Sequence, residues 1–151
     1  MFEIINTVLS TVFAPILMFP PMIAEAIITA FMMFTSSMFS KYLVDQEAVR
    51  TIKNEIKSLQ TKAKELQKTA PQEANKLFSE ILKLNNKYMK LNLKPMIATM
   101  TLVILFFPWL SSVFLGKVVF TIFGFTFGWL LWYIILSLVF SMIFRKLLGV
   151  Q

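Results

Sequence analysis

The 151-residue sequence contains no cysteine and no histidine. Without them the chain cannot form disulfides, use a thiol or an imidazole in catalysis, or build the usual zinc sites. Its long apolar stretches hold a single carboxylate, Glu25, so they offer no pair of catalytic acids. We therefore expect neither an enzyme nor a bound metal or other cofactor.

Charge is scarce over most of the chain and concentrated in one part of it. Residues 41–94 carry 12 of the 15 basic and 6 of the 8 acidic side chains. Hydrophobic residues make up 57% of the sequence, and the mean hydropathy is +0.70, well above the values of soluble proteins. This distribution predicts an integral membrane protein with one long, water-facing insert.

Three stretches are long and apolar enough to cross a bilayer, which takes about 20 residues. They predict transmembrane helices over 22–43, 95–116 and 117–145, with a cytoplasmic tail over 146–151. Gly124 and Gly128 form a GxxxG pair, which suits packing of the third helix against another helix.

The N-terminal segment, residues 1–21, has a shorter apolar run with polar residues at helical spacing. This pattern predicts a helix that lies on the outer membrane surface. The alternative is a fourth span that folds back at Pro20 and Pro21.

The insert, residues 44–94, has a regular apolar pattern. Apolar side chains alternate at spacings of three and four from Val49 to Ala70, and again from Ala74 to Leu91. Two such stripes joined by a short turn form an antiparallel coiled-coil hairpin. The predicted fold class is therefore an all-α integral membrane protein. It has three transmembrane helices, an N-terminal interfacial helix, and a coiled-coil hairpin between the first and second spans.

Basic residues predict the orientation, because short loops rich in Lys and Arg stay in the cytoplasm. The coil and the C-terminal end, with Arg145 and Lys146, are expected inside, and the N-terminus outside. One row of lysines on the coil leads down to the membrane: Lys83, Lys87, Lys90 and Lys94. This row suits anionic lipid headgroups, and it also suits the phosphates of a ribosome.

Polar and flexible side chains recur on single faces of the predicted spans. If these faces meet, they enclose a mildly hydrophilic groove; otherwise their hydroxyl groups hold the helices together. Methionines suit a groove that accepts varied apolar partners. The candidate groove residues are Thr29, Met33, Ser36, Ser40, Met96, Met100, Thr101, Tyr133, Ser137 and Ser141.

This arrangement resembles the minimal core of the YidC/Oxa membrane insertase superfamily. The stretch Gly128-Trp-Leu-Leu-Trp-Tyr133, with Ser137, Ser141 and Arg145-Lys-Leu-Leu148, is similar to the small archaeal YidC-like proteins. The resemblance implies an energy-independent insertase of the plasma membrane, whose groove receives hydrophilic flanks of nascent membrane proteins. Anionic lipids, the ribosome and a second membrane subunit are the other expected partners.

One feature departs from the superfamily pattern. Bacterial members carry an arginine inside the groove, whereas no predicted span here contains an internal basic residue. Lys41, at the cytoplasmic end of the first span, is the nearest candidate.

A second function also fits this sequence, that of a membrane-anchored coiled-coil scaffold or regulatory subunit. The two functions differ in whether the polar faces of the spans line an open cavity or are sealed against each other.

Overall fold

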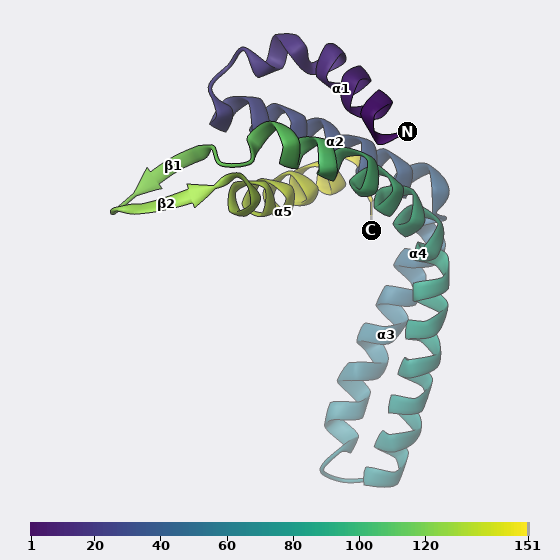
Figure 1. Cartoon of the computed structure of the whole chain (residues 1–151). Coiled ribbons are helices and arrows are strands. Elements are labelled where there is room, and N and C mark those ends of the chain that lie inside the picture. Colours follow the sequence, from purple (N-terminus) through teal and green to yellow (C-terminus); the bar gives the residue numbers. More distant parts are fainter. Residues whose placement is uncertain (151) are drawn as a thin grey trace.

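The structure, a computed structural model, describes residues 1–150. It comprises a helical bundle with a long arm at one end and a small β-hairpin at the other (Figure 1). Its elements are α1 (Phe2–Leu17), α2 (Pro21–Leu43), α3 (Gln46–Leu66), α4 (Pro71–Phe114), β1 (Val118–Ile122), β2 (Phe125–Gly128) and α5 (Trp129–Leu148). Helices α2 and α5 and the second half of α4 form the bundle, whereas α3 and the first half of α4 form the arm.

Three helices are long and apolar enough to cross a membrane, namely α2, α4 and α5. Their packed core includes Ile28 and Met32 of α2, Trp109 and Leu110 of α4, and Tyr133 of α5. Most other large apolar side chains of these helices are exposed. Such an extensive apolar surface is typical of a protein that meets lipid, so the predicted multi-pass membrane protein is confirmed.

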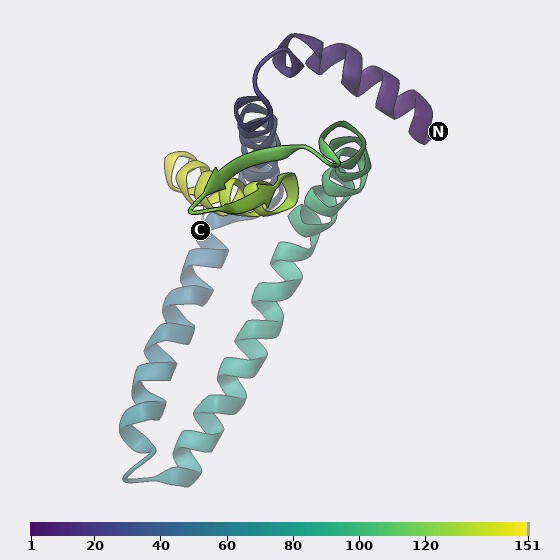
Figure 2. The same ribbon diagram turned by 60° about the vertical axis from the view of Figure 1, so that its left-hand side comes forward.

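The arm consists of two antiparallel helices, α3 and the first half of α4, that lie side by side (Figures 1 and 2). Helix α3 begins at Asp45, whose carboxylate accepts hydrogen bonds from the backbone N–H groups of Glu47 and Ala48 at 3.0 and 3.1 Å. The buried seam between the helices contains Val49, Ile52, Ala63, Ala74 and Ile81. These residues all belong to the two predicted apolar stripes.

Helix α4 passes without interruption from the arm into the bundle, over 44 residues. The sequence had placed the end of the coil at 94 and the start of the second span at Pro95. Proline removes one helical hydrogen bond and crowds the preceding turn, which bends a helix without ending it when both sides are packed. Accordingly, α4 changes direction where the arm meets the bundle (Figure 1).

The prediction of one apolar helix over 117–145 was wrong at its N-terminal end. Residues 118–128 form an antiparallel β-hairpin, and α5 begins only at Trp129 and continues to Leu148, beyond the predicted end. Apolar content alone does not separate a strand from a buried helix, and the Val, Phe, Thr and Ile residues here favour strands. The fold is mostly helical, consistent with the predicted all-α membrane protein, and this hairpin is the departure from the predicted layout.

The hairpin also changes the role of the GxxxG pair. Gly124 lies in the hairpin turn with φ +81°, and Gly128 is the residue that precedes α5. Neither residue lies within a helix, so they do not form a helix-packing motif.

Helix α1 is apolar but has only 16 residues, roughly 24 Å at the α-helical rise. It contacts the bundle through Phe13, which is buried beside Phe106 and Trp109. Leu9, Ile16 and Leu17 of α1 also pack against this core, whereas the N-terminal end of α1 points away from the bundle (Figure 2). Its placement on the outer membrane surface stays a prediction.

Candidate functional site

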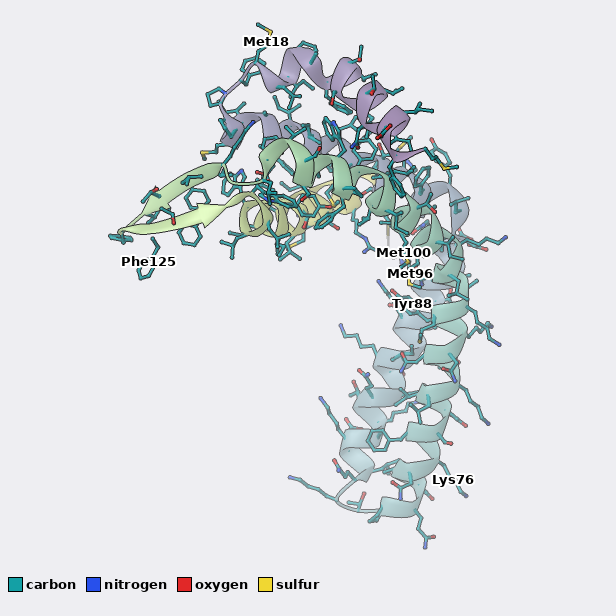
Figure 3. The ribbon with its side chains drawn as sticks, in the orientation of Figure 1. Met18, Lys76, Tyr88, Met96, Met100 and Phe125 are labelled. Carbon is teal, nitrogen blue, oxygen red and sulfur yellow. The ribbon has the colours of Figure 1, made fainter. Side chains whose placement is uncertain are left out.

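A cavity of about 630 Å³ lies where the arm meets the bundle. Three helices line it: α2 contributes Ser36 and Ser40, α5 contributes Arg145, and α4 contributes the remaining residues on either side of its bend. Figure 3 shows Tyr88, Met96 and Met100 in order along this part of α4. The α4 residues that line the cavity are Tyr88, Met89, Asn92, Leu93, Pro95, Met96, Thr99 and Met100.

The cavity is open on its α4 side. Met89, Leu93, Met96 and Met100 all line it, and all four side chains are exposed. Unbranched methionine side chains adapt to apolar groups of different shapes. This side of the cavity therefore offers a flexible apolar surface next to a polar wall.

The polar wall is formed by the side chains of Ser36, Ser40, Asn92 and Thr99, and hydrogen bonds fix the helices around it. The hydroxyl oxygens of Ser36 on α2 and Thr99 on α4 lie 2.9 Å apart and share a hydrogen bond. At the end of α2, Gln46 donates a hydrogen bond to the carbonyl oxygen of Ser40 at 2.7 Å. Asn92 donates to the carbonyl oxygen of Tyr88 at 2.8 Å, within α4.

Arg145 is the functional candidate that the sequence interpretation missed. The predicted third span ended at 145, so Arg145 was counted with the cytoplasmic end of the chain. In the structure α5 starts later and Arg145 lies in its last turn, where it lines the cavity. Gly149, with φ +68°, ends the helix and was the sequence signal for its true end.

Arg145 is therefore a basic side chain in the lining of this cavity. Lys41, the substitute proposed from the sequence, is exposed and does not line the cavity.

The structure brings together four of the predicted groove residues and separates the others. Ser36, Ser40, Met96 and Met100 share the cavity. Thr101 is exposed, and its hydroxyl donates to the carbonyl oxygen of Ile97 in the same helix. The remaining predicted residues, which do not line the cavity, are Thr29, Met33, Tyr133, Ser137 and Ser141.

Beyond the cavity, the interior of the bundle is closed. Thr29 and Glu25 on α2 are fully buried, and Tyr133 is almost fully buried against Phe107. The Glu25 carboxylate lies beside the backbone of Tyr133, but neither of its oxygens makes a hydrogen bond, and the Thr29 hydroxyl has no partner either. The polar face of α2 is thus open toward the arm and sealed toward the hairpin.

The four lysines of the predicted row, Lys83, Lys87, Lys90 and Lys94, are all exposed on the arm part of α4. The arm runs crosswise to the bundle helices rather than continuing their direction (Figures 1 and 2). Across residues 1–150, no group of three or more acidic side chains is arranged to hold a metal ion.

The three apolar helices and the cavity at their arm end define the class of this molecule, a multi-pass integral membrane protein. A family model described as "Integral membrane protein EMC3/TMCO1-like" matches residues 4–151, and the chain belongs to that family. The family is related to membrane protein insertion and falls in the YidC/Oxa1/Alb3 insertase-related group, as the resemblance implied. No curated protein and no solved structure is significantly similar to the chain.

Proposed function

We propose that the protein is a membrane protein insertase, in which the cavity at the corner of the arm and the bundle receives hydrophilic flanks of its substrates. The observation that carries this proposal is the composition of that cavity. Ser36, Ser40 and Thr99 supply hydroxyl groups, Arg145 supplies a cation, and methionines border the open side. The closer likeness to the small archaeal YidC-like proteins is part of the same proposal.

The cavity can lower the main cost of insertion. An unpaired backbone amide or a charged group is expensive to move into hydrocarbon. Hydroxyl groups and the guanidinium of Arg145 can replace the water that such groups lose, and acidic flanks gain most from the positive charge. Meanwhile the apolar segment of the substrate passes across the exposed methionines into lipid.

The orientation and location follow from the same proposal. The arm and the C-terminus lie in the cytoplasm and the N-terminus outside, because the arm carries most of the basic residues. In a plasma membrane the cavity then opens at the cytoplasmic surface, where nascent membrane proteins arrive. The exposed lysines of the arm contact anionic lipids, and a ribosome and a second membrane subunit are further proposed partners.

A photo-crosslinker placed singly along α4 and α2 tests the proposal. Ribosome-bound nascent membrane proteins are offered to membranes that contain variants labelled at Ser36, Met96 or Met100. Thr101 is the matched control, since it adjoins Met100 and is exposed without lining the cavity. Crosslinks at the three cavity positions and not at Thr101 are expected. Equal crosslinking at Met100 and Thr101 would contradict a cavity that guides the substrate.

A membrane-anchored scaffold is the second candidate, favoured by the sealed interior around Thr29 and Glu25. If the protein is a scaffold, no substrate enters the cavity. Nascent-chain crosslinks are then expected to be absent at Ser36, Met96, Met100 and Thr101, and the arm is expected to capture a cytosolic protein.

A further inference from the structure

The β1–β2 hairpin lies at the end of the bundle that faces away from the arm. It joins Phe114, the last residue of α4, to Trp129, the first residue of α5. In the view of Figure 2 it lies across the ends of the bundle helices rather than extending their direction. Because α4 and α5 are membrane-spanning helices, the hairpin is placed at a membrane boundary.

The hairpin has an apolar face and an apolar tip. Cross-strand partners share a face, so the pair Phe120–Phe127 and the pair Ile122–Phe125 lie on the same side, with Thr121 and Thr126 on the other. Near the base of this face Phe120 stacks on Phe127 and contacts the ring of Trp132 on α5, with centroids 4.7 and 4.9 Å apart. Toward the tip nothing covers the side chains, and Phe125 is 72% exposed.

The turn itself is unfavourable for an isolated hairpin in water. Phe123 and Gly124 have φ of +52° and +81°, which is the pattern of a two-residue type I′ turn. Asparagine is preferred at the first of these positions, and a bulky side chain there is strained. Phe123 is moreover 97% exposed, so the folded chain gains almost nothing from its ring. The ring needs an apolar environment outside the protein.

The backbone of the hairpin limits how deeply it can lie in a membrane. A two-stranded sheet leaves unpaired N–H and C=O groups along both outer edges, and such groups are not tolerated in hydrocarbon. At the boundary between headgroups and acyl chains, water reaches the edges while side chains extend into the apolar region. The neighbouring groups suit that depth, because Trp132 and Lys117 are residue types found at membrane boundaries.

We propose that the hairpin is an interfacial lipid anchor, which inserts Ile122, Phe123 and Phe125 into the leaflet opposite the arm. Lipid fits better than a protein partner, because the apolar tip continues the exposed apolar surface of the spans through Leu115, Val118 and Leu130. The anchor would fix the depth of α5. That helix has only 16 residues from Trp129 to Phe144 before its basic end, and Arg145 at that end lines the cavity.

The absence of cysteine allows a direct depth measurement by single nitroxide labels in lipid nanodiscs. A Phe123→Cys label is compared with a label at Val139, on an exposed face of α5, and at Gln60, on the arm. The ratio of relaxation by oxygen to relaxation by a water-soluble nickel complex is expected to be well above that of the Gln60 label and to lie between the values for Gln60 and Val139, because the hairpin is at the membrane boundary and Val139 is within a span. A ratio like that of Gln60 would overturn the proposal, and so would protection from both reagents, which indicates a protein partner.

A variant that keeps the turn separates anchoring from folding. Phe123→Asn suits a left-handed backbone, and Phe125→Asn removes the second exposed ring. With a reporter at Thr126, on the opposite face, the double variant is expected to raise nickel accessibility several-fold while a reporter at Val139 is unchanged. Unchanged accessibility at Thr126 would show that the two rings do not hold the hairpin in the membrane.

Discussion

Ser36 on α2 and Thr99 on α4 share a hydrogen bond of 2.9 Å between their side-chain oxygens, at the wall of the cavity. The two residues are 63 positions apart in the sequence, and the arm is the segment between them. This bond therefore closes the corner at which the arm leaves the bundle. A change in its strength alters how firmly α2 and α4 are held there.

Removing this hydrogen bond should destabilise the bundle slightly. For Ser36→Ala and Thr99→Val, we expect a coupling free energy of about 0.6 kcal/mol in a double-mutant cycle, typical of hydrogen bonds between membrane helices. The measurement is reversible unfolding in bicelles. A parallel cycle of Ser137→Ala with Thr99→Val serves as control, because the Ser137 hydroxyl bonds to Ile134 of its own helix. A coupling as large in the control cycle would contradict the prediction.

Helix α1 should be held less firmly when its polar contact with the bundle is removed. The indole N–H of Trp109, a fully buried residue, donates to the Ser10 hydroxyl at 2.8 Å. Ser10→Ala is expected to cost about 1 kcal/mol of local stability, which speeds amide exchange in α1 roughly five-fold. Thr11→Ala is the control, because that hydroxyl bonds to Thr7 of the same helix. Equal amide exchange rates in α1 for Ser10→Ala and Thr11→Ala would show that the Ser10–Trp109 hydrogen bond does not hold α1 against the bundle.

The buried hydroxyl of Thr29 has no hydrogen-bond partner, and this should cost stability. Thr29→Val keeps the shape and removes the polar group, so the free energy of unfolding is expected to rise by about 1 kcal/mol. Thr101→Val, at an exposed position, should change it little. If Thr29→Val lowers the stability instead, the hydroxyl is satisfied in the membrane by water, and the bundle is less sealed than its packing indicates.

The sequence predicted the helical parts well because their periodicity is long and regular. The three apolar stretches and the two arm stripes each extend over several helical turns, so an error of a residue or two does not change the assignment. The hairpin was missed because Val118–Gly128 is as apolar as the helix after it. What distinguishes the segment is its β-branched and aromatic content and the turn at Phe123 and Gly124. Asn-Gly is the usual sequence signal for such a turn, and here Phe takes the place of Asn.

That error also hid the basic residue of the cavity. The predicted span began twelve residues before Trp129 and ended three residues before Leu148, so Arg145 was placed at its final position, with the cytoplasmic tail. Thr29 and Ser36 illustrate a different limit. Both lie on one polar face of α2, yet one is sealed in the core and the other lines the cavity. Spacing within one helix cannot distinguish them, because burial depends on the helices that pack against it.

The lysine row on the arm should hold the arm near anionic lipid. Each lysine close to such a surface contributes about 1 kcal/mol. A nitroxide at Asn86 is expected to lose nickel accessibility in anionic but not in zwitterionic vesicles. Replacing Lys83, Lys87, Lys90 and Lys94 with Gln should restore accessibility. The same change at Lys53, Lys57, Lys62 and Lys64 of α3 is the charge-matched control, and an equal effect there would show that only net charge matters.

Arg145 should set the preference of the cavity for substrate charge. Arg145 lines the cavity and is half-buried, and its guanidinium attracts a carboxylate more strongly there than it would in bulk water. Arg145→Gln in proteoliposomes is therefore expected to reduce insertion of a substrate with an acidic flank by roughly ten-fold, or about 1.4 kcal/mol. A neutral flank should be inserted nearly as before, and Arg145→Lys should retain part of the preference. Lys146→Gln removes the same charge from the adjacent, exposed position and should have little effect. Equal losses for Arg145→Gln and Lys146→Gln, or equal losses for both flanks, would mean that the charge acts through orientation or folding and not within the cavity.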